Sequence, residues 1–370
     1  MGQLWVDEAN PTNLIGNPYA WTNISSMLFI EAPACVGYSY ADTLDGCAHN
    51  DSSQAVDNYE ALQQFFVGFP EFADNDFYIT GESYAGIYVP TLAQQVVRGA
   101  AKINLKGIAV GNGCLGLNIG TCAFDYKNEL NSNMPYFAGH GLIAPTTYAA
   151  VVKDCDPAAA TPSAACSADF DAAHGEIGRV NIYNIYGPCV TGSAGALDAA
   201  GRRVHSRAPV PVRSDGPVEC IDETLAKYVG RADVAAALHV FPLNWAACGS
   251  NSSFSYTRTE LDERLDVYPD IWNAKVRVLV YNGEADACVP WVDNEGWVRS
   301  LNFTVTAPWA AWTSNEQVAG YEVRYTSPSG SPFDFATVKG AGHMVPQFRP
   351  AEAWTMFSQF IAGQPLTAAR

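Results

Sequence analysis

Apolar residues along this chain gather in short uninterrupted runs and in longer stretches with a helical period. The short runs, rich in β-branched and aromatic residues, predict buried strands at 27–31, 76–80, 106–110, 276–281 and 333–339. Apolar side chains recur every three or four positions in the longer stretches, which predict helices at 54–66, 87–97, 145–152 and 351–361. Strand and helix alternate in the first third of the chain. The sequence therefore predicts an α/β fold, with a mostly parallel central sheet and helices on both faces.

The character of the sequence changes between about 117 and 230. Alanine, proline, glycine and cysteine become more frequent there, and strand-like runs disappear. We expect residues 1–116 to form the first part of the core, 117–230 an inserted cap region, and 231–370 the second part of the core. Within the cap, 191–217 has almost no large apolar residue, which predicts an exposed, mobile loop.

One serine stands in a tight turn between a predicted strand and a predicted helix. Gly81, Ala85 and Gly86 are small enough to let the two elements pass close together, so that the hydroxyl of Ser83 projects from the turn. Ala85 occupies the place of the second glycine of G-x-S-x-G, and an ordinary strand-to-helix turn would explain the same residues. Ser83 is a candidate nucleophile.

A serine nucleophile needs a base, and the base needs a third group to fix its tautomer. Asp286 and His343 each follow a predicted strand, and with Ser83 they obey the order serine, acid, histidine of the α/β-hydrolase arrangement. Glu284 is an alternative acid, and either carboxylate could be a turn residue without a catalytic role. We prefer Asp286 because it reaches further beyond its strand.

Composition and charge narrow the class of partner. The 370 residues are 48% hydrophobic, and 21 basic against 38 acidic residues give a net charge of −17, which argues against nucleic acid or an anionic membrane as a partner. No apolar run is long enough to span a bilayer. The ten cysteines lack paired C-x-x-C spacing, which favours disulfides and an oxidising compartment over a metal site. Sequons begin at Asn23, Asn50, Asn251 and Asn302 and are compatible with glycosylation.

Two motifs resemble those of the serine carboxypeptidases, a family with the α/β-hydrolase fold. They are Gly81-Glu-Ser-Tyr-Ala-Gly86 and Gly342-His-Met-Val-Pro346. Similar segments recur along the chain at 17–21, 28–33, 36–40, 111–113, 237–240 and 286–290. The resemblance covers nearly everything outside the cap.

The resemblance implies a role for each residue of the site. Ser83 would be the acylated nucleophile, His343 the general base and then acid, and Asp286 the group that orients the histidine. The backbone N–H of Tyr84 would supply an oxyanion donor. The ring of Tyr84 and the side chain of Met344 would line substrate side-chain pockets.

Two glutamates, Glu8 and Glu82, would hold the terminal carboxylate of the substrate. This contact requires protonated glutamates with raised pKa values, and so favours operation at acidic pH. Glu82 could also act as a capping carboxylate at the helix. The expected function is a serine exopeptidase acting on peptides or proteins with a free C-terminus, without cofactor or metal. The alternatives are an acyltransferase on the same scaffold and an inactive, truncated product.

The resemblance also implies that a segment carrying the second oxyanion donor should lie directly before Met1. We therefore expect this chain to lack that segment together with a signal peptide. The protein is then expected in the secretory pathway, in a vacuole or lysosome or outside the cell. Glu284 stands where the family usually has aspartate, which keeps the charge.

The resemblance and the spacing of the cysteines suggest disulfide pairs. By resemblance, Cys189 would pair with Cys220, and Cys248 with a cysteine of the missing segment. Closeness along the chain alone suggests three further pairs: Cys35–Cys47, Cys114–Cys122 and Cys155–Cys166.

Overall fold

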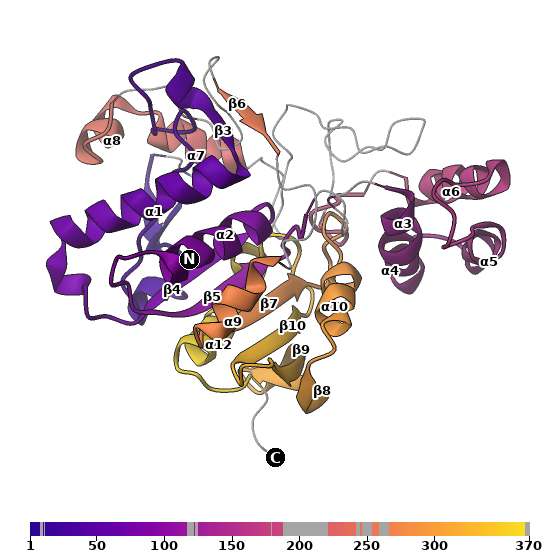
Figure 1. Ribbon diagram of the computed structural model, residues 1–370. Helices are drawn as coiled ribbons and strands as arrows, with labels where there is room; N and C mark the ends of the chain where they lie inside the picture. Colours follow the sequence, from indigo (N-terminus) through magenta and orange to yellow (C-terminus); the bar gives the residue numbers. More distant parts are fainter. Residues whose placement is uncertain are drawn as a thin grey trace.

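The computed structural model describes residues 1–7, 10, 12–116, 122, 125–178, 180–187, 221–241, 245, 254–258 and 266–366. Figure 1 shows a sheet with helices on both sides and a separate group of helices beyond one end of it. The strands are β1 (Leu4–Val6), β2 (Leu14–Gly16), β3 (Ala48–Asn50), β4 (Phe77–Glu82), β5 (Leu105–Gly111), β6 (Ser255–Thr257), β7 (Arg277–Gly283), β8 (Thr304–Ser314), β9 (Gln317–Thr326) and β10 (Pro332–Val338).

Helices lie between many of these strands, and α3 to α8 follow one another between β5 and β6. The α-helices are α1 (Asp51–Gly68), α2 (Ala85–Arg98), α3 (Tyr126–Asn128), α4 (Met134–Gly139), α5 (Pro145–Asp154), α6 (Ala164–Ile177), α7 (Ile221–Val229), α8 (Ala232–Ala237), α9 (Tyr268–Asn273), α10 (Trp291–Ser300), α11 (Val345–Phe348) and α12 (Pro350–Ile361). Short 3-10 helices occupy Trp21–Asn23, Asp45–Cys47 and Pro70–Phe72, and a π-helix occupies Glu129–Asn133.

The described part of the chain forms one six-stranded sheet, in the order β4-β5-β7-β10-β9-β8. The first four strands are parallel, and β9 and β8 are antiparallel to their neighbours. The prediction of a mostly parallel α/β sheet is therefore confirmed. Because β4, β5, β7 and β10 run in one direction, the segments that follow them all begin at the same end of the sheet.

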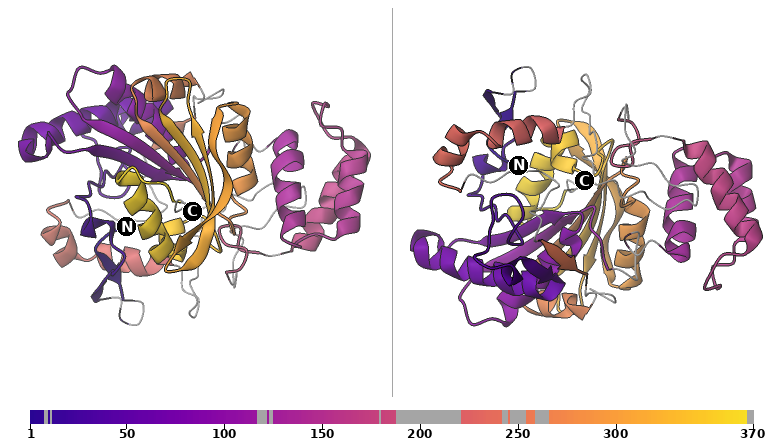
Figure 2. Two further views of the ribbon diagram at one scale, coloured as in Figure 1. Left: turned by 90° about the horizontal axis from the view of Figure 1, so that it is seen from below. Right: turned by 90° about the horizontal axis from the view of Figure 1, so that it is seen from above.

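Alternate residues of each strand point to opposite faces of the sheet, and helices cover both faces. On one face, Ile108, Val278 and Phe335 pack with side chains from α1, α2, α9 and α10. On the other face, Leu279 and Ala336 pack with α12. Figure 2 shows this layering with the sheet seen on edge.

The β8–β9 hairpin was not expected from the sequence. Its two turn residues, Asn315 and Glu316, have φ values of 49° and 63°, as a tight two-residue hairpin turn requires. The alternation of apolar and polar residues in 321–326 was the available signal. Glutamate is uncommon in such turns, so the turn itself gave little indication.

The strand predicted at 27–31 is wrong. These residues form no strand, and Leu28, Phe29 and Ile30 are 39%, 62% and 39% exposed. A strand needs a neighbour to complete its backbone hydrogen bonds. The edge strand β4 is separated from this segment by a cavity of about 1140 Å³, whose lining includes Leu28, Tyr78 and Thr80 as well as side chains of α1, α2 and α12.

The described helices of the predicted cap, α3 to α6, have an apolar core of their own, which includes Met134, Val151 and Phe170. They stand to one side of the sheet (Figure 2). Helices α7 and α8 straddle the predicted boundary at 230, and α7 contacts β1 instead of the cap helices (Figure 1). The domain boundaries stay a prediction, and the loop predicted at 191–217 lies outside the described residues.

The three disulfides suggested by closeness along the chain are confirmed: Cys35–Cys47, Cys114–Cys122 and Cys155–Cys166. Cys189, Cys220 and Cys248 lie outside the described residues. Among the described helices, none combines the length and the apolar character needed to cross a lipid bilayer.

Candidate active site

Ser83 occupies the turn between β4 and α2 in a backbone conformation that is rare for serine. Its φ is +63°, in the left-handed region, which costs a residue with a Cβ on the order of 1 kcal/mol or more. Its N–H donates to the Gly111 carbonyl (3.0 Å), and its carbonyl accepts from the N–H groups of Gly86 and Cys114 (both 2.9 Å). These bonds hold the turn in its strained form, and Ser83 remains half-buried rather than enclosed.

The small residues around the serine are required by close packing. A Cβ on Gly86 would lie 2.2 Å from the carbonyl oxygen of Cys114, and one on Gly81 would lie 2.5 Å from the Cβ of Ala85. Any larger side chain would push α2 away from β4 or from the segment that follows β5. The steric argument made from the sequence is confirmed, although β4 continues to Glu82 instead of breaking at Gly81.

Asp286 and His343 form a buried pair at the carboxyl ends of β7 and β10. Nδ1 of His343 lies 2.7 Å from Oδ2 of Asp286, and the two residues are 2% and 0% exposed. The His343 backbone N–H donates to the Tyr183 carbonyl (2.7 Å), and the ring of Tyr183 packs edge-on against the imidazole. The tyrosine thus fixes the position of His343 from the inserted region.

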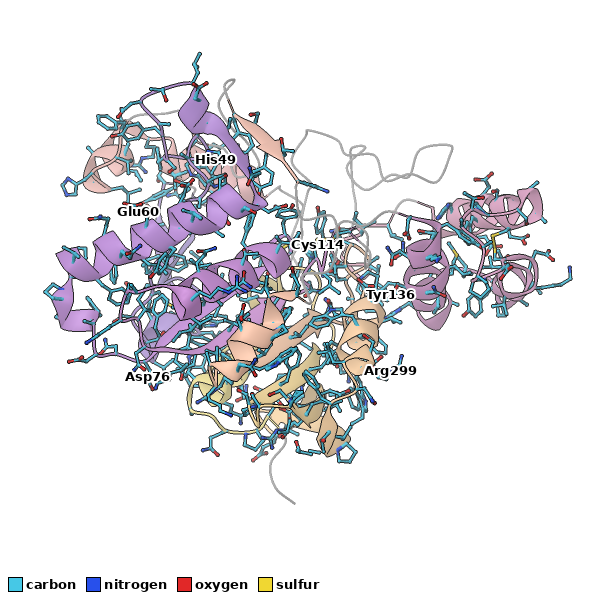
Figure 3. All side chains as sticks on the ribbon, in the orientation of Figure 1. His49, Glu60, Asp76, Cys114, Tyr136 and Arg299 are labelled. Carbon is cyan, nitrogen blue, oxygen red and sulfur yellow. A yellow bond between two sulfur atoms is a disulfide. The ribbon has the colours of Figure 1, made fainter. Side chains whose placement is uncertain are left out.

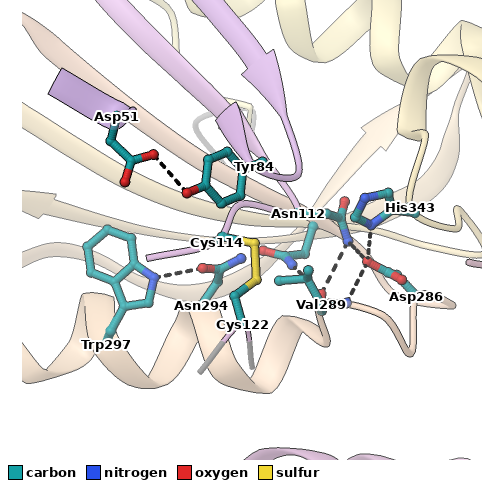
Figure 4. The surroundings of a disulfide bond; sticks show 11 residues. Asp51, Tyr84, Asn112, Cys114, Cys122, Asp286, Val289, Asn294, Trp297 and His343 are labelled. Carbon is teal, nitrogen blue, oxygen red and sulfur yellow. Dashed lines mark hydrogen bonds and ion pairs between the residues drawn. A yellow bond between two sulfur atoms is a disulfide. The ribbon is translucent and has the colours of Figure 1, made fainter. Parts of the chain in front are cut away.

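The Asp286 carboxylate receives further hydrogen bonds from groups that sequence analysis did not assign. Oδ1 accepts from the N–H of Cys288 (2.7 Å), and Oδ2 accepts from the N–H of Val289 (3.1 Å) and from Nδ2 of Asn112 (2.7 Å). Figure 4 shows Asn112 and His343 converging on this carboxylate. The signal in the sequence was Asn112 itself, a polar residue between two glycines after a buried strand.

Glu82 ends β4 directly before the serine and is half-buried. Its pKa is raised to about 7, mainly by burial; the positive charge of His343 opposes the rise, the negative charge of Asp286 adds to it, and the N-terminal ammonium opposes it. Glu82 is thus close enough to both members of the pair to be influenced by their charges. A glutamate that is protonated below neutral pH can donate a hydrogen bond to a carboxylate, as the sequence analysis required of Glu82.

Tyr84 is the N-cap residue of α2, where the first backbone N–H groups have no acceptor within the helix. Its hydroxyl donates to Oδ1 of Asp51 (2.8 Å; Figure 4), and Asp51 also accepts from the hydroxyl of Tyr256 (2.7 Å). The Arg258 guanidinium lies 5.1 Å from the centre of the Tyr84 ring. Burial and the Asp51 contact raise the pKa of Tyr84 well above its ordinary value, so the hydroxyl stays protonated.

The remaining predicted site residues differ in how far the structure describes them. Met344, half-buried, follows His343 directly and is the N-cap of α11. Glu8 lies outside the described residues. The pocket-lining role of Met344 and the carboxylate-binding role of Glu8 both stay predictions.

Glu284, the alternative acid, lies against a different histidine. Its Oε1 is 3.4 Å from Nε2 of His140, and its Oε2 accepts from the Gly340 N–H (2.9 Å). Its backbone carbonyl accepts from the hydroxyl of Tyr136 (3.2 Å), which faces the sheet from α4 (Figure 3). Glu284 thus ties the inserted helices to the loop that carries Asp286.

One group of potential metal ligands occurs among the described residues. The ligand atoms of Asp286, Cys288 and His343 lie within 4.8 Å of one another. However, both oxygens of Asp286 already accept hydrogen bonds from N–H donors, and a cation would have to displace them. This donor set fits an acid–base pair better than a metal centre.

Comparison with known proteins agrees with the geometry. The sequence model of the serine carboxypeptidase family matches residues 1–363. Serine carboxypeptidase-like 20 of Arabidopsis thaliana is 32% identical over 394 residues, which cover 95% of this chain and 76% of that protein. Serine carboxypeptidase 1 of Hordeum vulgare is 30% identical, with 95% and 76% covered. The solved structure of Kex1Δp, a prohormone-processing carboxypeptidase of Saccharomyces cerevisiae, matches with a TM-score of 0.67 at 17% identity, covering 98% of this chain and 78% of that one, and supports the fold.

The His140–Glu284 pair should make stability depend on pH. Burial alone would lower the pKa of His140, but its bonds to Glu284 and to the Tyr136 carbonyl outweigh burial and raise the pKa above 6.5. The same contact lowers the pKa of Glu284 below 4.5. The pair is therefore fully charged between these two values. Its contribution is lost as pH rises through the raised His140 pKa, and as pH falls through the lowered Glu284 pKa.

We expect His140→Gln to lower the free energy of unfolding most between about pH 4.5 and 6.5, by about 1 kcal/mol or less because both groups are partly exposed. Urea unfolding at a series of pH values measures the difference. Arg299→Gln, which breaks the pair between exposed Arg299 and Glu295, is the control and should show no such window. A loss of equal size at pH 5.5 and pH 9 would contradict the prediction.

Proposed function

Because the chain belongs to the serine carboxypeptidase family, we propose that it is a serine-type carboxypeptidase that releases C-terminal residues from peptides through an acyl-enzyme. The observation that carries the proposal is the buried Asp286–His343 pair, at the same end of the sheet as the strained Ser83. A buried carboxylate on Nδ1 leaves Nε2 of the histidine as the atom that can exchange a proton with the serine.

In the proposed acylation step, Oγ of Ser83 attacks the scissile carbonyl while Nε2 of His343 takes its proton. The oxygen of the tetrahedral intermediate gains a negative charge, which the Tyr84 N–H stabilises. The intermediate then collapses, His343 gives the proton to the departing amine, and the C-terminal amino acid leaves. Water then attacks the acyl-enzyme while Nε2 of His343 takes its proton. The proton passes to Oγ of Ser83, and the shortened peptide leaves.

The proposed preference for a C-terminus depends on Glu82. Its carboxyl group lies one residue before the nucleophile and has a pKa of about 7, so at acidic pH it is a neutral donor. A neutral donor can bind the substrate carboxylate, whereas an ionised one would repel it. This supports a peptidase that works at acidic pH. The disulfides support an oxidising compartment such as a vacuole, a lysosome or the cell exterior.

We further propose that one more strand completes this end of the sheet. The support is the cavity beside β4, which is lined on one side by Tyr78 and Thr80 and on the other by Leu28 and Ile30. A strand pairing with β4 there would complete the backbone hydrogen bonds of both walls and end next to Ser83. It would place a second N–H donor near the proposed oxyanion, as the resemblance implies.

Activity should depend on Ser83. We expect Ser83→Ala to abolish release of the C-terminal residue from a blocked dipeptide, because no other group supplies the acylated oxygen. Ser300→Ala, an exposed serine at the end of α10, should leave the rate unchanged. Amino-acid release by mass spectrometry is the measurement. A parallel reaction with an acyl-glucose donor and an alcohol tests acyl transfer, and acyl transfer without dipeptide hydrolysis would overturn the proposal.

The dependence of kcat/KM on pH should follow the ionisation of Glu82. We expect kcat/KM for a peptide with a free carboxylate to fall about tenfold per pH unit above about pH 7, where Glu82 ionises. Glu82→Gln should remove this decline, because glutamine stays neutral, while the exposed Glu60→Gln should keep it. The corresponding peptide amide should also lack the decline. A Glu82→Gln profile identical to that of the unaltered protein would refute the role.

The added strand can be tested by comparing this chain with a form extended before Met1 by the adjoining coding sequence. We expect the extended form to be roughly a hundred- to a thousand-fold faster in kcat, the usual effect of one oxyanion donor. Its activity should still require Ser83. Equal turnover by the two forms would disprove the added donor.

A further inference from the structure

We propose that Asn112 is a positioning residue for catalysis, which holds the Asp286 carboxylate in the orientation that His343 needs and stabilises its negative charge. The inference rests on the proposed function, and it assigns a role to a residue that follows β5, between the strands of the nucleophile and of the acid. Asn112 is completely buried.

The hydrogen-bond partners of its oxygen and nitrogen fix the orientation of the Asn112 side-chain amide. Oδ1 accepts a hydrogen bond from the Gly283 N–H (2.9 Å), so the other end of the amide must be the NH₂ group. That group donates to Oδ2 of Asp286 (2.7 Å), the oxygen that also contacts Nδ1 of His343. Asn112 therefore acts on the oxygen that orients the histidine (Figure 4).

The backbone conformation of Asn112 directs its side chain towards Asp286. Its φ is +43°, in the left-handed region that asparagine tolerates better than most residues. Its N–H donates to the Tyr281 carbonyl (2.8 Å), which extends the parallel pairing of β5 with β7 by one residue. The side chain is thereby turned back across β7 towards the loop that carries Asp286.

The contact matters because the carboxylate is cut off from water. A buried carboxylate must accept hydrogen bonds in place of those it would make with water. Hydrogen bonds to an ionised group are among the strongest in proteins. The Cys288 and Val289 N–H groups belong to the same loop as Asp286 and move with it. Asn112 and His343 are the donors that come from other strands, and Asn112, which follows the neighbouring strand β5, fixes the carboxylate relative to the sheet.

The titratable groups that face Asp286 are the Cys288 thiol of its own loop and groups from three neighbouring elements. His343 follows β10, Glu82 ends β4, and Tyr136 lies on α4. Of these, only His343 donates to the carboxylate. A negative charge introduced at position 112 would lie next to Oδ2 of Asp286, and would favour the protonated form of His343.

The decisive variant is Asn112→Asp, which keeps the shape, the backbone conformation and the acceptor for Gly283. At acidic pH the new carboxyl shares a proton with Asp286, and the net charge of the site is unchanged. As pH rises, that proton leaves, and the extra charge draws a proton onto His343. We expect the rise of kcat with pH, which follows deprotonation of the His343 base, to move to higher pH than in the unaltered protein.

Asn112→Ala removes the donor at every pH. We expect kcat to fall about tenfold to a hundredfold with little change in KM, as for a lost hydrogen bond to a buried charge. Asn282→Ala is the matched control. Asn282 is buried beside the same loop and donates to the Val289 carbonyl (3.1 Å), without contacting Asp286. It should reduce stability without altering the pH profile.

An NMR titration of His343 in the substrate-free protein separates this inference from the proposed function. Asn112→Asp should move that titration to higher pH whether or not the protein cleaves peptides. An unshifted titration would overturn the inference, as would a kcat profile parallel to that of the unaltered protein. An Asn112→Asp variant that fails to fold would also overturn it, because Asn112 would then serve the fold instead of the charge on Asp286.

Discussion

The parallel pairing of β4, β5, β7 and β10 is the constraint on which the rest of this structure depends. Parallel strands place all their carboxyl ends at one end of a sheet, and their register sets how far each following turn extends. Gly111 pairs with Tyr281, and Val338 pairs with Gly283. Residues far apart in the sequence, from Ser83 to His343, are thereby placed at the same end of the sheet.

Close packing at this end of the sheet leaves little freedom for the backbone. Gly86 lies against the segment after β5, and a Cβ on Gly283 would lie 2.0 Å from the Gly342 carbonyl oxygen. The turns carrying Ser83, Asp286 and His343 are thus held by close backbone packing against their neighbours. The strain at Ser83 and the burial of Asp286 are unfavourable by themselves, and the surrounding hydrogen bonds and apolar core offset them.

The inserted helices contact this end of the sheet, whereas residues 24–32 are separated from the sheet. The inserted helices contact the acid loop through Tyr136 and His140, which hold Glu284, and the inserted region also fixes His343 through Tyr183. On the opposite side, the cavity beside β4 separates residues 24–32 from the sheet. The run at 27–31 has the composition of a strand but lacks a partner, so its apolar side chains remain partly exposed.

The sequence alone determined the alternation of strands and helices, the parallel sheet and the order of Ser83, Asp286 and His343, because these follow from local periodicity and from turn residues. It also indicated the small residues of the turn, since their size is a local property. It did not reveal the β8–β9 hairpin, the unpaired run at 27–31 or the contact of Asn112 with Asp286. These depend on which strands become neighbours and on what each buried polar group meets across the sheet. Such long-range pairings are set by the packing of the whole chain, and only the tertiary structure decided them.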